Sequence, residues 1–375
     1  MTEVLPQEKV LSINMDIRET VNSISPLYPD AMAKARERQD MLAKPPGSLG
    51  RLEELSVQLA GITGKVNNEI NKKTLLVFCA DNGVIEEGVA SAPQSVTLAQ
   101  TINLTRKKTG AAVLSDHIGC EIKVFDMGVN ADISDPYVID RKIRKGTDNI
   151  SKGPAMTREE AEKAIATGIA EAAASAKDAD VLGIGEMGIG NTTTSSAVLA
   201  VLTGKPVREL TGRGAGITDD SYEKKIRTIE EATEINRPDR NDVIDVIAKV
   251  GGFDIAAMTG AFLGAAAARC PVVIDGFISA VAALCAARIC PTARDYFIPS
   301  HASFEIGYRI AMGELDLRPL FDLDMRLGEG SGCPIAMQIL EDACAVMNNM
   351  ATFEEAEIND DYLEPIRSSD SFTVR

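Results

Sequence analysis

A glutamate enclosed by glycines near the C-terminal end is the residue of this sequence best suited to do chemistry. The segment Met325–Gly332 reads MRLGEGSG and places Glu329 between Gly328 and Gly330, just before a helical pattern of apolar residues. Glycines on both sides let the backbone turn sharply and let a second molecule approach closely. A carboxylate held at the mouth of an apolar cleft has a raised pKa and can act as a general base. The alternative is an ordinary glycine-rich turn with a solvated glutamate.

A second glycine-rich segment has the order of an anion site. Gly183–Thr193 follows an apolar run, contains Glu186 and opens a helical pattern. Free N–H groups at a helix start favour a phosphate, and we assign this role to Gly188, Gly190, Asn191 and Thr192. The segment lacks the lysine of a nucleoside-triphosphate loop. Its glycine spacing also fits a dinucleotide fingerprint weakly, and a turn needed only for helix packing is a third interpretation.

A third segment, Thr211–Ile217, offers backbone donors as well. It contains Gly214 and is followed by two lysines, of which Lys225 is a candidate to balance the charge of a phosphate. The sequence leaves open which of the two glycine-rich loops holds that phosphate. Two further acids in glycine turns, Asp254 and Asp275, are at least as well explained as helix caps.

The composition limits the classes of partner. The chain has 375 residues, of which 45% are hydrophobic and 25% charged, as in an ordinary globular protein. Its net charge of −16 argues against nonspecific binding to nucleic acid or to an anionic membrane. Seven cysteines without CxxC pairs indicate buried thiols in a reducing compartment, and two histidines are too few for a histidine-rich metal centre. Without a secretory signal or a membrane-length apolar run, we expect a cytoplasmic protein.

Apolar runs alternate with helical patterns along the chain. We expect strands at residues 74–80, 121–128, 181–185, 271–276 and 296–301. Strands that alternate with helices predict an α/β fold, a parallel sheet with helices on both faces in a Rossmann-like three-layer arrangement. A helical stretch is expected between about residues 88 and 114, and a capping box at Thr157–Glu160 heads another helix. The first 29 residues are expected to be irregular.

Helical patterns near the two chain ends, at 30–62 and 333–353, are expected to pair as a small domain. We therefore predict four units along the chain. These are an N-terminal helical segment of the small domain (1–65), an α/β core domain (66–325), a C-terminal helix that completes the small domain (326–355) and a tail (356–375).

Seven short motifs occur in the order typical of one protein family. They are KPPGSLGRLE (44–53), CADNGV (79–84), GEMGIGNTT (185–193), KVGGFD (249–254), VIDGF (273–277), IPSH (298–301) and MRLGEGSG (325–332). With these motifs the chain closely resembles the nicotinate-nucleotide:dimethylbenzimidazole phosphoribosyltransferases of cobamide (vitamin B12) assembly, over roughly residues 30–350. The collective match is far more specific than any single motif.

The resemblance implies a fold, a reaction and partners. Members of this family have a parallel α/β sheet with a small helical domain from both chain ends, and they form dimers. They transfer 5-phosphoribose from nicotinate mononucleotide to a lower-ligand base, with inversion at the anomeric carbon, and release nicotinate. Some relatives attach phenol or p-cresol instead, and some of those work beside a paralogous subunit.

The resemblance also implies roles for individual residues. The general base of the family falls on Glu329, and the glutamate of its GEMG-type loop falls on Glu186. A lysine that follows the third glycine-rich segment falls on Lys225, and a glutamine beside the incoming base falls on Gln100.

Two positions depart from the family pattern. Asn82 stands where the family usually has histidine, and Ala92 stands where it commonly has a serine that helps to hold the base. A missing hydroxyl leaves one polar edge of the incoming ring unheld. Phenolic acceptors are therefore candidates beside dimethylbenzimidazole.

Two other classes of function compete with this interpretation. A non-catalytic nucleotide-binding partner subunit has no need of a buried base, so the presence of Glu329 and Glu186 argues against it. A Rossmann oxidoreductase needs an acid about 20 residues after the glycine loop in a strand context, and none is found. We expect an enzyme without metal or cofactor that uses nicotinate mononucleotide and an aromatic acceptor, as a homodimer or with a paralogous subunit.

Overall fold

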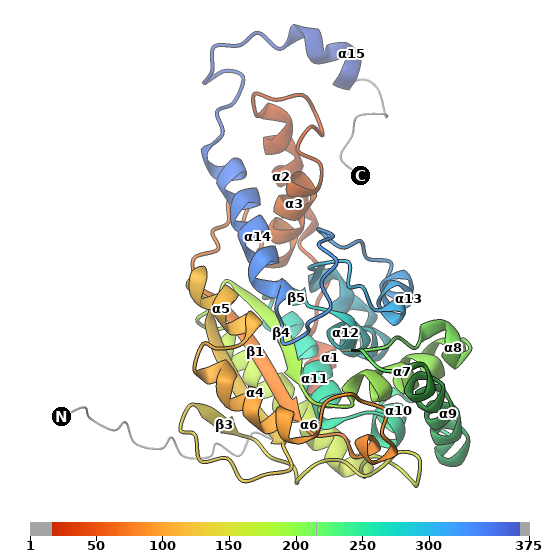
Figure 1. The fold of residues 1–375 in the computed structure, drawn as a ribbon. Helices are drawn as coiled ribbons and strands as arrows, with labels where there is room; N and C mark the ends of the chain where they lie inside the picture. Colours follow the sequence, from red (N-terminus) through yellow and green to blue (C-terminus); the bar gives the residue numbers. More distant parts are fainter. Residues whose placement is uncertain (1–16, 215, 368–375) are drawn as a thin grey trace, which may run out of the picture.

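A six-stranded parallel sheet forms the centre of the computed structural model, which describes residues 17–214 and 216–367 (Figure 1). The strand order is β3-β2-β1-β4-β5-β6, and every neighbouring pair is parallel. The predicted α/β fold is thereby confirmed. The strands are β1 Lys73–Ala80, β2 Glu121–Gly128, β3 Val138–Asp140, β4 Val181–Met187, β5 Val272–Ile274 and β6 Phe297–Pro299.

Helices cover both faces of the sheet (Figure 1). The first half of the described chain contributes α1 Ile17–Ser23, α2 Pro29–Met41, α3 Arg51–Thr63, η1 Gly83–Glu87, α4 Ser95–Thr105, α5 Gly110–His117 and α6 Arg158–Ser175. The central part contributes α7 Asn191–Thr203, α8 Val207–Leu210, α9 Asp219–Asn236, α10 Val243–Val250 and α11 Phe253–Ala267. The last part contributes α12 Phe277–Ile289, η2 Pro291–Tyr296, α13 Ile306–Leu315, α14 Gly332–Asn349, η3 Asp361–Leu363 and α15 Glu364–Arg367.

Two hydrophobic cores lie on opposite faces of the sheet because successive side chains of a strand point in opposite directions. In β1, residues 75, 77 and 79 belong to the core shared with α3, α5 and α14. Residues 76, 78 and 80 belong to the core shared with α6, α11 and α12. All seven cysteines are free and buried, as the sequence predicts. Within the described residues, no helix combines the length and the apolar character needed to cross a membrane.

Helices from the two ends of the chain pack side by side above the sheet (Figure 1). Helices α2, α3 and α14 share a small core of Ala31, Ala35, Val57, Ala60 and Met347. The division of the chain into four units remains a prediction.

Several local expectations are corrected, and one is confirmed. Residues 17–23 form α1 rather than irregular chain, and residues 1–16 lie outside the described part. The helical stretch near 88–114 is two helices, because Thr109 accepts the N–H of Ala112 and starts α5 anew. Strand β3 was not predicted, and α15 lies within the predicted tail, of which residues 368–375 are outside the described part. The capping box of Thr157 and Glu160 is present at the start of α6.

Candidate active site

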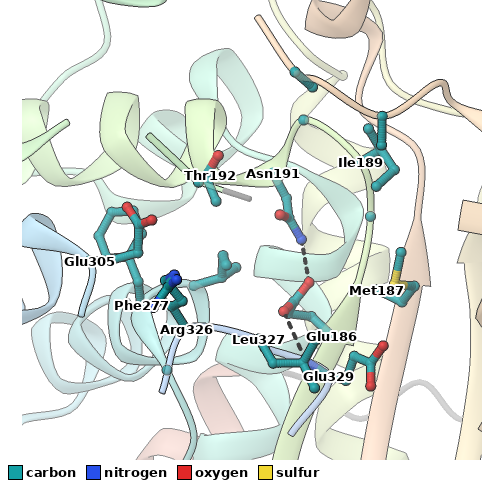
Figure 2. Close-up of a pocket in the computed structure, with 18 of the residues that line it drawn as sticks. Glu186, Met187, Ile189, Asn191, Thr192, Phe277, Glu305, Arg326, Leu327 and Glu329 are labelled. Carbon is teal, nitrogen blue, oxygen red and sulfur yellow. Dashed lines mark hydrogen bonds between the residues drawn. The ribbon is translucent and has the colours of Figure 1, made fainter. Parts of the chain in front are cut away.

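One cavity lies beyond the carboxyl ends of β1, β4 and β5, where an α/β sheet usually places its ligands (Figure 2). Its walls come from the loop at 89–92, the start of α4, the turn from β4 to α7, residues 213, 214 and 217, the start of α12 and the loop at 303–305. The loop before α14 completes it. Ten predicted site residues line this cavity: Glu329, Glu186, Gly188, Gly190, Asn191, Thr192, Gly214, Gln100, Ala92 and Gly328.

Glu329 is presented to the cavity by a loop that the strand β5 anchors. Both carboxylate oxygens of Asp275 accept N–H groups of this loop, from Gly330 at 3.0 Å and from Gly332 at 2.7 Å. Glu329 itself has a positive φ of 64°, which strains a residue with a side chain. Gly328 has a positive φ of 83°, and a Cβ added there would lie 2.7 Å from Glu186 Oε1, so glycine is favoured at this position. The anchored turn therefore fixes where the Glu329 carboxylate stands.

The Glu329 carboxylate is buried among hydrogen-bond donors. The N–H of Ala111, at the start of α5, donates to its Oε2 at 3.3 Å, and Gln100 Nε2 donates to its Oε1 at 3.4 Å. Burial raises the pKa of this carboxyl, and the donors from α5 counteract part of the rise. A carboxylate with a raised pKa is a stronger base than a solvated one.

Glu186 and Asp254 form a pair of buried acids behind Glu329. Both accept from the side-chain amide of Asn191, which lies 3.0 Å from Asp254 Oδ2. The bond from Asn191 to Glu186 Oε2 is the shorter of the two and is drawn in Figure 2. The N–H of Glu329 donates to Glu186 Oε1 at 3.4 Å. Burial, followed by the charge of Asp254, raises the pKa of Glu186 to about 8. Burial raises the pKa of Asp254 to about 6. Glu186 therefore carries a proton through much of the neutral range.

The turn from β4 into α7 offers an anion site. Gly190 caps α7 with a positive φ of 97°, a conformation that favours glycine. Thr192, in the first turn of α7, faces the cavity together with Gly214 from the neighbouring loop. A helix start of this kind directs N–H groups and the positive end of the helix dipole at a bound anion.

Lys225 lies behind this anion site and does not line the cavity. Its Nζ donates to Thr192 Oγ1 at 2.9 Å and to the carbonyl of Gly212 at 3.2 Å. Burial lowers the pKa of the ammonium group to about 8, and the charge of Glu305 counteracts this change. Lys225 therefore holds two segments that border the cavity and places its positive charge behind them, without lining the cavity itself.

Two other predicted site residues also lie outside the cavity lining. Asn82 is fully buried, and its Oδ1 accepts from Thr194 Oγ1 at 3.3 Å. Gly330 belongs to the anchored turn, where its N–H donates to Asp275.

A group of apolar side chains, called the apolar wall below, also lines the cavity. Val89, Ala92 and Val96 line it together with Met187 and Ile189. A planar aromatic ring fits such a wall, and Gln100 supplies a polar group beside it.

Sequence reasoning missed several residues of the site. Asp275, Phe277, Glu305, Arg213 and Arg326 all line the cavity. The signal for Asp275 was available, because this acid directly follows a strand at the edge where ligands bind. We find no comparable sequence signal for Glu305.

The chain matches the model of the phosphoribosyltransferase family over residues 24–358. The nicotinate-nucleotide–dimethylbenzimidazole phosphoribosyltransferase of Clostridium perfringens is 52% identical over 96% of this chain and 99% of its own length. The enzyme of that name from Ruminiclostridium cellulolyticum is 55% identical over 92% of this chain and 98% of its own. The crystal structure of CobT from Thermus thermophilus has a TM-score of 0.85 and 39% identity, and it covers 88% of this chain and 100% of that one. The chain belongs to the nicotinate-nucleotide–dimethylbenzimidazole phosphoribosyltransferase family of enzymes.

Proposed function

We propose that this chain transfers 5-phosphoribose from nicotinate mononucleotide to a cobamide lower-ligand precursor. The reaction releases nicotinate and yields an α-riboside 5′-phosphate. The acceptor is a dimethylbenzimidazole-like base or a phenol such as p-cresol. The names of the relatives support the donor and the base, and the alanine at position 92 supports the inclusion of phenols.

The observation that carries this proposal is the buried Glu329 carboxylate in a cavity that polar and apolar side chains line together. In the proposed step, a ring nitrogen or a phenolic oxygen of the acceptor attacks C1′ of the ribose. The bond from C1′ to the nicotinate nitrogen breaks, and its electron pair stays with that nitrogen. The proton of the acceptor passes to Glu329, whose raised pKa suits it to receive one.

Glu186 is proposed to act beside the anomeric carbon. With a pKa of about 8 it is largely neutral at pH 7, so it can donate a hydrogen bond to an oxygen of the ribose. It also accepts the N–H of Glu329 and thereby holds the turn that carries the base.

The 5′-phosphate is proposed to bind at the start of α7. Gly188, Gly190, Asn191 and Thr192 form this turn, and Gly214 faces it from the neighbouring loop. The role of Lys225 is then to keep Thr192 and Gly212 in place and to supply positive charge from behind. Asn82 supports the same turn through Thr194.

The acceptor is proposed to lie against Val89, Ala92 and Val96, with Gln100 at its polar edge. On the family resemblance alone, we further propose that the chain works as a dimer, either homomeric or with a paralogous subunit. Light scattering on the purified chain measures its mass, and a monomer that is fully active would contradict this assembly.

Nicotinate release tests the proposed function directly. The purified chain is given nicotinate mononucleotide with dimethylbenzimidazole, adenine, phenol or p-cresol, and both nicotinate and the riboside phosphate are measured. We expect release that depends on an added acceptor. Release that is absent with every acceptor, also in the presence of a paralogous subunit, would reject the transfer reaction.

A further inference from the structure

The chain between α4 and α5 is interrupted where the sequence predicts one helical stretch. Helix α4 ends at Thr105 and α5 begins at Gly110. Lys107, in the connection, has a positive φ of 56°, a conformation that strains a residue with a side chain. Because the first N–H groups of a new helix have no partner within that helix, the interruption leaves free donors at the start of α5.

These free donors face the Glu329 carboxylate. The N–H of Ala111 donates to its Oε2 at 3.3 Å. The oxygen of the Thr109 hydroxyl caps α5 by accepting the N–H of Ala112 at 3.2 Å, which leaves the hydroxyl proton to donate to the Glu329 carboxylate. Thr109 is 4% exposed, and neither it nor Ala111 lines the cavity. The start of α5 therefore holds Glu329 from behind.

The other carboxylate oxygen of Glu329 is held from α4. Gln100 Nε2 donates to Oε1 of Glu329 at 3.4 Å, and Asn103 Nδ2 donates to Gln100 Oε1 at 3.0 Å. Since Asn103 occupies the oxygen of the Gln100 amide, the NH2 group of that amide is directed to Glu329. A continuous helix would pair the N–H of residue 111 internally, so the interruption makes both sets of donors available.

The groups on the other sides of Glu329 act against its ionisation. Burial and, to a smaller extent, the charge of Asp275 from the end of β5 raise the pKa of the Glu329 carboxyl. Glu186, from β4, accepts the N–H of Glu329, and Asp254, at the start of α11, lies behind Glu186. His301 Nδ1 lies 3.9 Å from Asp275 Oδ1. The donors of α5 thus favour the charged form of a carboxyl that its other surroundings disfavour.

Resting on the proposed function, we propose that the junction of α4 and α5 keeps the general base ionised and aimed at the acceptor, with Thr109 as its positioning residue. The proton of the acceptor passes to Glu329 during the attack, so the step needs an ionised carboxylate when the acceptor binds. Hydrogen bonds from N–H and O–H groups favour this form, and the positive end of the α5 dipole adds to them. The same preference favours loss of the proton before the next turnover.

The pH dependence of the reaction tests this role. Thr109→Val keeps the shape of the side chain and removes the hydroxyl, and Thr109→Ala also lacks it, whereas Thr109→Ser keeps it. We measure kcat/KM for dimethylbenzimidazole against pH at saturating nicotinate mononucleotide. Without the hydroxyl, the value on the acid side of the profile should fall by about tenfold relative to wild type, because the protonated carboxyl is then favoured. On the alkaline side it should stay within about twofold, and Thr109→Ser should follow wild type.

Thr157→Val is the matched control, because Thr157 caps α6 in the same way and accepts the N–H of Glu160 at 3.2 Å. This variant should lower stability, as the loss of a cap does, without moving the pH profile. A Thr109→Val profile that falls equally at every pH would make Thr109 a cap alone, and an unchanged profile would remove it from catalysis. Either result overturns the proposal.

A double-mutant cycle tests the contact without turnover. Glu329→Gln is combined with Thr109→Val and, separately, with Thr157→Val, and urea unfolding is measured at neutral pH. The first pair should be coupled by about threefold or more in the unfolding equilibrium constant, and the second pair should be additive. Additive effects in both pairs overturn the role of the junction. If the first pair is coupled but the chain releases no nicotinate with any acceptor, the transfer reaction fails while the hold on Glu329 stands.

Discussion

Helix α11 has charged side chains at both ends, and the two ends differ in how well those charges are satisfied by hydrogen-bond partners. At its start, Asp254 is fully buried and shares the Asn191 amide with Glu186, and burial raises the pKa of both carboxyls. Just beyond its end, Arg269 donates to the backbone carbonyls of residues 26, 61 and 62. Its guanidinium also lies 3.7 Å from the ring centre of Tyr28.

The helix dipole alone does not explain the difference, because it favours an anion at the start and a cation at the end alike. The partners differ instead. Arg269 has an acceptor for each of its three nitrogens and joins the N-terminal segment to α3, which makes it a structural tie. The acids at the other end have a neutral amide between them and no ion pair to a described residue. Crowded acids cost stability, and they persist where a site uses them.

The largest effect is expected from a change at Glu329, the proposed base, which lies beside the acids at the start of α11. Glu329→Gln keeps the shape of the side chain and one of its two acceptor oxygens, but it removes the ability to take a proton. General-base catalysis typically contributes about 10²–10⁴-fold, so kcat should fall by about that factor while nucleotide binding stays nearly intact. Steady-state kinetics and calorimetry measure the two effects. Near-normal turnover at neutral pH would show that Glu329 is not the base.

The structural end of the helix should respond in the opposite manner. Arg269→Ala removes hydrogen bonds to three carbonyls and the contact with Tyr28, which should lower the free energy of unfolding by about 2–3 kcal/mol. The kinetic constants of the folded fraction should stay within about twofold of wild type, because the residue lies outside the cavity lining. Urea unfolding and initial rates at low temperature measure both. A large kinetic defect without loss of stability would contradict the division of roles.

The acid pair also predicts how stability depends on pH. Glu186 has a pKa of about 8 in the folded chain against an ordinary value of 4.5, so the folded chain binds this proton more tightly. The resulting stability is complete below about pH 4.5 and is lost as the pH rises towards 8. Asp254→Asn removes the neighbouring charge and should lower the pKa of Glu186.

The variant should therefore lose less stability than wild type between pH 5 and pH 8, because the pKa of Glu186 falls and because Asp254, with its own raised pKa of about 6, no longer titrates. The difference should be about 1 kcal/mol or more, since one pKa unit is worth about 1.4 kcal/mol. Chemical unfolding at both pH values gives this difference without reference to the absolute stability of either protein. The same substitution at the exposed Asp342 of α14 is the control and should leave the pH dependence as it is. An identical slope in wild type and Asp254→Asn would mean that Asp254 neither titrates in this range nor raises the pKa of Glu186.

The sequence was sufficient to predict those parts of the site whose residues lie in one short segment. Glu329 between its glycines and the turn before α7 are local patterns, and both line the cavity. What it could not reach depends on contacts between distant segments. The place of Asp275 directly after a strand was a local signal, but its hydrogen bonds to the turn at 330–332 depend on the position of β5 beside β4. Lys225 lies outside the cavity lining because α9 packs on α7. No local pattern encodes either distance.

The smallest effect is expected at Ala92, which affects neither end of α11 and should alter only the choice of acceptor. Ala92 lies on the apolar wall beside Val89, and Ala92→Ser adds a hydroxyl there. A benzimidazole has a second ring nitrogen that gains from such a partner, whereas the ring of a phenol prefers an apolar surface. One hydrogen bond is worth about 0.5–1.5 kcal/mol, so the ratio of dimethylbenzimidazole to phenol activity should rise by about tenfold at most.

A phenol must also lose a proton during the attack, which distinguishes the effect of Ala92 on acceptor choice from the catalytic role of Glu329. Its pKa is close to that of tyrosine, about 10, so its hydroxyl must lose a proton to Glu329 during the attack. Ala92→Ser leaves that base in place, and the change should therefore appear in the acceptor KM rather than in the pH profile. Both acceptors are assayed with wild type and Ala92→Ser at several pH values. An unchanged or lowered ratio would show that the wall at position 92 does not choose the acceptor, and the choice would then rest with Val89, Val96 or a partner subunit.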